Sequence, residues 1–139
     1  MRKVSIIIAV CMVVAVSLTL FSQGRDLDPV MKEIQPTSAG LTAGMRGATM
    51  PASEVIKEAE KLQKLFTEVN AFMKGKNLEK GAGWASEAAT AASDLAKAAK
   101  ANDYDSMMSA QKVIAKSCGT CHAVHREQLP DKTFKLKAP

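Results

Sequence analysis

Two thiols and an imidazole stand together near the end of the chain, in the sequence Cys118-Gly119-Thr120-Cys121-His122. Thiols at this spacing bind zinc, exchange disulfides or form thioether bonds to the vinyl groups of a haem. A histidine directly after the second thiol can bind a metal ion. The chemistry of these residues is therefore zinc binding, thiol redox exchange or haem attachment.

The surrounding sequence favours haem attachment. A zinc site needs four ligands, and beyond the N-terminal segment described next the chain offers Cys118, Cys121, His122 and His125, all within eight residues. A thiol–disulfide motif opens a helix after a strand, and nothing before Cys118 has the pattern of a strand. We expect one covalently bound haem c per chain, with thioether bonds to Cys118 and Cys121 and with His122 as an iron ligand.

The start of the chain has the pattern of a secretory signal peptide. Arg2 and Lys3 precede an uncharged run over residues 4–21, and small residues follow for cleavage near 22–24. We predict that residues 1–24 are removed during export to the periplasm, which leaves no stable membrane association. An uncleaved membrane anchor is the alternative, because eighteen apolar or weakly polar residues are close to the shortest membrane span.

The charge and length of the remainder limit its function. The 139-residue chain carries 19 Lys and Arg against 14 Asp and Glu, and two of the basic residues leave with the signal peptide. No basic cluster is interleaved with aromatic residues, which argues against nucleic acid as a partner. The length suffices for one domain, which we place at residues 25–130, followed by a basic tail at residues 131–139.

Apolar spacing after the signal peptide is helical throughout, so we expect an all-α fold. The clearest helix covers residues 53–73, with Gly75 as a left-handed cap. Its apolar stripe recurs every three or four residues, at Val55, Ala59, Leu62, Phe66, Val69 and Met73. An alanine-rich helix is predicted over residues 82–100, with Trp84 in the core.

Two further helices are predicted on either side. The first starts at Asp28, ends near Ala43, and is interrupted or kinked by Pro36. Asp103 caps a last helix over residues 104–127, whose inward face carries Tyr104, Gln111, Ile114, Cys118 and Cys121. Four helices with short connections predict an antiparallel up-and-down four-helix bundle with the haem attached to the last helix.

With the haem motif on its last helix, the chain resembles the class II c-type cytochromes, which include cytochrome c′ and its low-spin relatives. The small globular cytochrome c fold is disfavoured, because it carries the motif early and a methionine ligand far downstream. Here only seventeen residues follow His122, and none is Met. The family has an aromatic–arginine pair after the motif; His125 replaces the aromatic residue, and Arg126 stands where the family has its arginine. The segment Asn102-Asp103-Tyr104-Asp105 is similar to the start of the family's last helix.

The resemblance implies a candidate for the iron ligand opposite His122. Low-spin members use a methionine on the first helix, and Asp28-Pro29-Val30-Met31-Lys32 is similar to that segment, so Met31 is the predicted ligand. Leu27 departs from the family, which has an arginine four residues before the ligand. The alternative is that Met31 is a core residue and the iron is five-coordinate, as in cytochrome c′. His125 follows His122 by one turn on the same helix and cannot reach the opposite haem face.

The resemblance also implies that Arg126 pairs with a haem propionate. Such a charge-assisted contact is worth about 1.5–3 kcal/mol when partly buried. A solvated surface arginine is the alternative. Lys132, Lys135 and Lys137 are expected to form a solubilising tail rather than a docking patch for a partner.

These expectations describe a soluble periplasmic electron carrier and not an enzyme. With Met31 and His122 both bound, the iron has no open position for a substrate, so the chemistry is one-electron transfer with redox proteins as partners. A five-coordinate haem protein that binds NO or CO is the alternative, and a thiol–disulfide protein without haem is a third. A homodimer through the first two helices is implied by resemblance alone.

Overall fold

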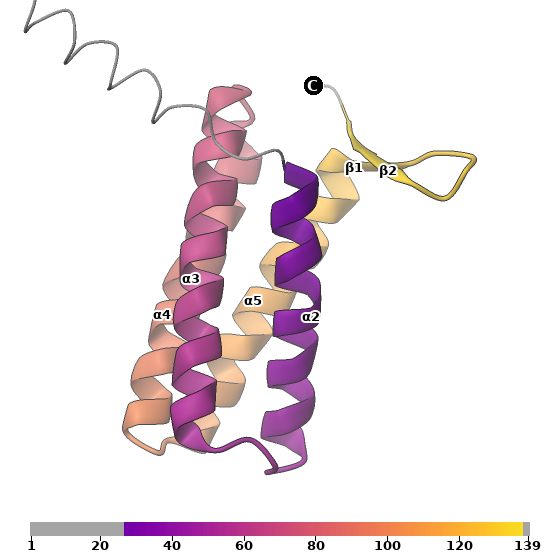
Figure 1. Cartoon of the computed structure of the whole chain (residues 1–139). Coiled ribbons are helices and arrows are strands. Elements are labelled where there is room, and N and C mark those ends of the chain that lie inside the picture. Colours follow the sequence, from indigo (N-terminus) through magenta and orange to yellow (C-terminus); the bar gives the residue numbers. More distant parts are fainter. Residues whose placement is uncertain (1–26, 138–139) are drawn as a thin grey trace, which may run out of the picture.

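The computed structural model describes residues 27–137, which fold into four α-helices and a short β-hairpin (Figure 1). The helices are α2 (Leu27–Arg46), α3 (Ala52–Gly75), α4 (Glu79–Lys100) and α5 (Tyr104–His125). Successive helices run in opposite directions and are joined by short turns, which confirms the predicted antiparallel up-and-down bundle. The predicted signal peptide, residues 1–24, lies outside the described residues.

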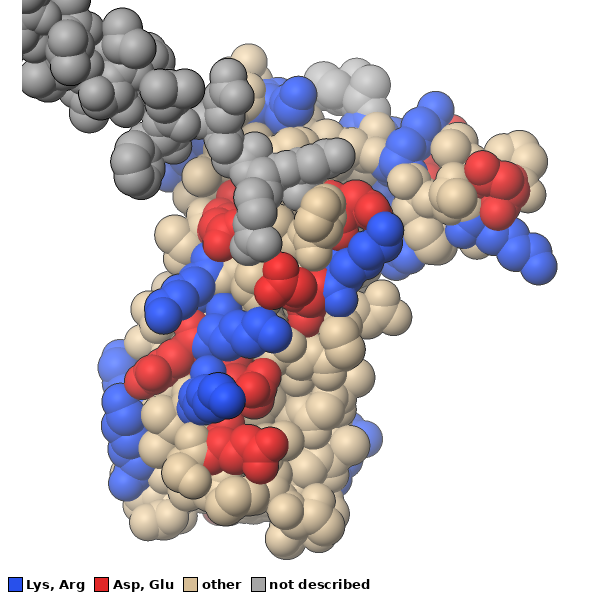
Figure 2. Space-filling model, in the orientation of Figure 1, with Lys and Arg blue, Asp and Glu red and all other residues tan. Residues whose placement is uncertain are grey.

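On the face of the bundle that Figure 2 shows, Lys and Arg lie among Asp and Glu. Lys61 on α3 faces Glu33 on α2 at 4.0 Å, and Lys100 on α4 contacts Glu60 on α3 at 3.2 Å. Because these side chains remain largely in water, each pair contributes little to stability. The free energy of folding comes mainly from the interior.

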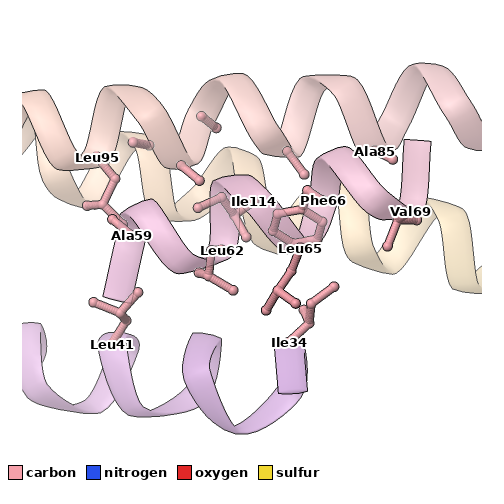
Figure 3. Packing of buried hydrophobic residues seen from close by; sticks show 14 of the residues in the cluster. Ile34, Leu41, Ala59, Leu62, Leu65, Phe66, Val69, Ala85, Leu95 and Ile114 are labelled. Carbon is pink, nitrogen blue, oxygen red and sulfur yellow. The ribbon is translucent and has the colours of Figure 1, made fainter. Parts of the chain in front are cut away.

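The core is built around α3, whose predicted apolar stripe is buried along its whole length (Figure 3). Leu62 is fully buried near the middle of α3, as are Leu41 of α2, Leu95 of α4 and Ile114 of α5. With 3.6 residues per turn, spacings of three and four place the apolar residues of α3 on one face. Burial of that face against its neighbours stabilises the bundle.

α4 contributes small side chains to the core, which let the neighbouring helices pack close to it. Its inward face is mostly alanine, including Ala88, Ala91, Ala92 and Ala99. Small side chains let helix axes approach, and α3 with α4 and α4 with α5 are the most closely packed pairs. α2 packs on α3, and few of its residues come near α5. The corner of the bundle between α2 and α5 is therefore loosely packed.

α2 differs from its predicted form. The helix continues through Pro36 without a break and ends at Arg46 rather than near Ala43. Pro36 is exposed, so the Lys32 carbonyl group that loses its helical partner can bond to water. Gly44 stays inside the helix, where a Cβ would lie only 2.7 Å from the Cβ of Met50 in the following turn.

The helix ends confirm one predicted cap and correct another. Asp103 caps α5 as predicted, because its carboxylate accepts a hydrogen bond from the Ser106 backbone N–H at 3.0 Å. Gly75 does not adopt a left-handed conformation; it is the last residue of α3, and Asn77 has the positive φ of 57° instead. Asparagine tolerates this region because its short side chain can hydrogen-bond locally.

Tyr104, predicted to face inward, is 48% exposed. It is the first residue of α5, and its hydroxyl donates a hydrogen bond to the Met45 backbone carbonyl at 3.3 Å. The phenol ring therefore lies across the end of the bundle, where its polar tip reaches α2. The prediction was wrong because the apolar stripe of α5 starts only at Met107.

The end of the chain forms a hairpin rather than a loose basic tail. β1 (Arg126–Gln128) pairs antiparallel with β2 (Phe134–Leu136), so α5 ends at His125, two residues earlier than predicted. Asp131 closes the turn by accepting hydrogen bonds from the backbone N–H of Thr133 at 2.9 Å and from its hydroxyl at 2.6 Å. The strands were not predicted because three residues are too few to give an alternating apolar pattern, and because the nearby lysines suggested a solvated tail.

Candidate functional site

A cleft of about 860 Å³ opens at the loosely packed corner between α2 and α5. Residues 27–42 of α2 and residues 111–125 of α5 supply its walls, side chains of α3 and α4 also line it, and residues of β1 and β2 complete it. The lining is mostly apolar. Its volume lies within the range of small-molecule and cofactor sites, about 300–1,000 Å³.

All five residues predicted to hold the cofactor line this cleft. Met31 lies on α2, Cys118, Cys121 and His122 lie on α5, and Arg126 is the first residue of β1. The bundle therefore brings residues from opposite ends of the described chain into one concave surface.

Cys118 and Cys121 are free thiols, separated by one helical turn of α5. Cys121 is buried and Cys118 is half-buried. Burial, with a smaller effect of the neighbouring Cys121, raises the pKa of the Cys118 thiol to about 11, and burial also raises the pKa of Cys121. Both groups are therefore neutral thiols near neutral pH.

His122 is half-buried one turn beyond Cys118. Burial, together with the positive charge of Arg126, lowers the pKa of the His122 imidazole below its usual value. The ring is therefore neutral near neutral pH. A neutral imidazole is the form that binds metal ions, so the electrostatics of this position suit a metal ligand.

Met31 is half-buried on the opposite helix, α2. A thioether carries no charge and needs no deprotonation before it binds a metal, so it suits an apolar wall. Next to it on the rim, Lys32 contacts Asp28 at 2.6 Å. The hydrogen bond and the charge of Asp28 raise the pKa of Lys32, but both side chains are exposed and the pair contributes little to stability.

Arg126 is held at the rim by an aromatic ring of the hairpin. The guanidinium carbon of Arg126 lies 3.3 Å from the centre of the Phe134 ring. Stacking uses the flat face of the guanidinium and leaves its N–H donors in the plane, where they can bind a carboxylate. The geometry is therefore compatible with the predicted propionate contact, and the solvated arginine remains the alternative because Arg126 is exposed.

His125, which replaces the aromatic residue of the family pattern, packs against α4. Its ring centre lies 5.9 Å from that of Trp84, and a Cβ added to Gly81 would meet its Cδ2 at 3.0 Å. Its Nε2 is buried without a hydrogen-bond partner. Trp84, predicted to lie in the core, is half-buried and lines the cleft. Both rings extend the apolar back of the cleft.

Sequence reasoning missed two contributions to the cleft. Gln111 was predicted to face inward, but no role was assigned to it; it is the first residue of α5 along the cleft and bonds across to α2. Phe134 and Leu136 of β2 also line the cleft. The sequence does contain a signal for Gln111, because it is an amide within the otherwise mostly apolar inward face of α5. The pairing of β2 with β1 has no comparable signal in the residues of β2 themselves.

Haem fits the side chains that share the cleft. Two neutral thiols, a neutral imidazole and a thioether face an apolar space, and an arginine lies at its rim. Within residues 27–137, no group of three or more His, Cys, Asp and Glu side chains is arranged to hold a metal ion.

Comparisons of the chain with protein families, with curated proteins and with solved structures found no match. Among the helices formed by residues 27–137, none combines the length and the apolar character needed to cross a membrane. The basis for assigning a function is therefore the motif, the fold and the cleft.

Proposed function

We propose that this protein is an exported, periplasmic c-type cytochrome that carries single electrons between redox proteins through one covalently bound haem. The observation that carries the proposal is the shared cleft, which Cys118, Cys121, His122, Met31 and Arg126 all line. These residues supply the groups that such a haem needs, namely two tethers, two axial ligands from different helices and a partner for a propionate.

Each side chain has a distinct role in the proposal. Cys118 and Cys121 form thioether bonds and keep the cofactor on α5. His122 binds the iron from the same helix, in the neutral form that its surroundings favour. Met31 binds from α2, and the apolar walls keep water away from the iron. When bound, the haem supplies a ferric–ferrous couple, whose potential a methionine ligand raises.

Occupation of both axial positions makes the protein a carrier and not an enzyme. With His122 and Met31 both holding the iron, a substrate would find no open position on it. Electron exchange with partner proteins would then need no change of ligand.

Covalent haem attachment is tested by expressing the chain with its leader in a host that matures c-type cytochromes. The product is expected to be coloured, and its mass is expected to include one haem that denaturation does not release. Cys118→Ala and Cys121→Ala each remove one thioether bond, and the double variant is expected to release its haem. A colourless parent with two free thiols would contradict the proposal and support the thiol–disulfide reading.

Axial ligation is tested by Met31→Ala, with Met108→Ala as the matched control. Met108 is a half-buried methionine of α5 that does not line the cleft. Met31→Ala is expected to lose the weak far-red band of methionine ligation, to bind CO in the ferrous state and to have a lower reduction potential. Met108→Ala is expected to keep all three parental properties.

Two results would change the assignment. If the spectrum of Met31→Ala matches that of the parent, Met31 is not a ligand. If the ferric parent itself has a broad high-spin spectrum, the iron is five-coordinate and binding of NO or CO becomes the better function.

A further inference from the structure

We propose that Gln111 is a positioning residue that sets the spacing of α2 and α5, and through it whether Met31 reaches the iron. Its effect on the iron rests on the proposed function, whereas its effect on the helices rests on geometry alone. Gln111 is only 5% exposed and is the first residue of α5 that lines the cleft.

The Gln111 amide joins the two helices. Its Nε2 donates hydrogen bonds to the Thr42 hydroxyl at 2.7 Å, to the Ser38 hydroxyl at 3.3 Å and to the Ser38 backbone carbonyl at 3.4 Å. The Thr42 hydroxyl donates its only proton to that same carbonyl at 2.9 Å, so it can only accept from Gln111. The NH₂ group must therefore face α2, and the orientation of the amide is fixed.

This orientation leaves the other half of the amide without a partner. The Gln111 Oε1 atom is buried and makes no hydrogen bond. An unsatisfied buried acceptor destabilises a fold, and an apolar side chain of similar size would avoid that loss. The unpartnered Oε1 therefore offsets part of the stabilisation that the Nε2 hydrogen bonds contribute. These hydrogen bonds are directional, so they also select one register of α2 against α5, as buried polar groups do in helix pairs.

Because of its position, the Gln111 contact affects the distance between α2 and α5 along the cleft. Tyr104 joins α5 to the end of α2 at Met45, and Gln111 joins the middles of the two helices. Farther from Tyr104 along the two helices lie Met31 of α2 and Cys118 and His122 of α5, which line the cleft. At a rise of 1.5 Å per residue, Met31 lies about 10 Å along α2 from Ser38, and Cys118 lies about 10 Å along α5 from Gln111. A shift at the amide contact is therefore transmitted to the level of the iron ligands.

The test uses the haem-containing protein and removes the contact from either side. Thr42→Val deletes the 2.7 Å hydrogen bond and leaves a half-buried side chain of the same shape, whereas Gln111→Leu deletes that bond and the two to Ser38 and leaves a buried side chain. Thr37→Val is the matched control, because Thr37 is a buried threonine of α2 and the α2 partners of the Gln111 amide are Ser38 and Thr42. Gln111→Leu and Thr42→Val are expected to lose most of the far-red methionine–iron band, to lower the potential and to admit CO. Thr37→Val is expected to behave as the parent.

A double variant separates positioning from loss of stability. If the two residues act through one contact, Gln111→Leu with Thr42→Val changes the potential no more than Gln111→Leu alone does, because Gln111→Leu already removes the bond to Thr42. Additive effects would contradict a shared contact. A parental band and potential in Gln111→Leu would overturn the role at the iron.

A second measurement determines the distance between α2 and α5 and does not depend on how the iron is bound. Spin labels attached through a ketone-bearing residue at exposed positions 29 and 124 leave the motif thiols untouched. The distance between the labels is expected to change or broaden in Gln111→Leu and Thr42→Val and to stay parental in Thr37→Val. An unchanged distance would overturn the positioning role, whatever binds the iron. A parent without methionine ligation would instead remove the proposed sixth ligand and leave the spacing result standing.

Discussion

The residues of the cleft divide into neutral walls and a charged rim. Burial keeps the thiols of Cys118 and Cys121 protonated, His122 is held neutral, and Met31 has no charge. The cations, among them Arg126, are exposed at the edge. A haem has an apolar macrocycle and two charged propionates. The walls therefore suit its ring, and the rim suits its acid groups.

The raised pKa of Cys118 predicts how the haem-free chain responds to alkaline pH. A thiol whose pKa is raised from 9.0 to about 11 on folding binds its proton more tightly in the folded state. Its contribution to stability is therefore fully present below pH 9.0 and is lost as the pH rises toward 11. Urea denaturation of the haem-free protein across this range measures the effect. Cys118→Ala is the control, and its stability is expected to fall less steeply; parallel curves would contradict the prediction.

At the scale of elements, the stability of the bundle is concentrated in α3 and α4. α3 buries bulky side chains along one face, and the alanines of α4 let its neighbours approach. α2 packs on α3 with fewer close approaches and makes polar contacts with α5 through Tyr104 and Gln111. The element that carries the predicted distal ligand is therefore held less firmly than the elements behind it.

Leu62→Ala tests the contribution of α3. Leu62 has no exposed surface, so its truncation is expected to lower the free energy of unfolding by about 2–5 kcal/mol. Gln63→Ala, at the next and exposed position of the helix, is expected to change it by less than about 0.5 kcal/mol. Urea denaturation of both variants with the haem bound gives the comparison. Similar losses in the two variants would show that the face of α3 does not carry the core.

The elements that could be predicted from the sequence are those whose signals are local. The stripe of α3 and the Asp103 cap of α5 depend on residues within a few positions of each other, and both were predicted correctly. The predicted interruption at Pro36 was wrong, because Pro36 is exposed and the carbonyl group that loses its partner can bond to water while the helix continues. The Gly75 cap was wrong because Asn77 could adopt the same conformation two residues later.

In the candidate site too, the residues that could be predicted are those identified by their near neighbours in the sequence, and the others depend on contacts between distant segments. Cys118, Cys121 and His122 could be identified from one short motif. Met31 needed a resemblance to a family, because nothing in its own segment shows that α2 faces α5. The stacking of Phe134 on Arg126 depends on a hairpin whose strands are too short to leave a pattern. Sequence reasoning therefore identified the attachment residues, while the fold was needed to define the cleft.

At the scale of the whole molecule, the loosely packed corner predicts where the protein opens. In the haem-free chain, amide hydrogens of α2 are expected to exchange fastest among the helices, and those of α3 and α4 slowest. Bound haem is expected to slow exchange in α2 more than in α3, because it fills the space between α2 and α5. Hydrogen exchange followed by mass spectrometry measures both. Equal protection of all helices without haem would contradict a loose corner.

The order of helix packing also has a consequence for folding kinetics. The helix pairs that pack on each other, α2 with α3, α3 with α4 and α4 with α5, are neighbours in the chain, and such local topologies fold quickly. The cleft instead joins α2 to α5, and its closure must order a much longer loop. We expect this closure to be the last step. A haem tethered to α5 would then be in place before α2 docks, and it would itself become part of the surface onto which the first helix folds.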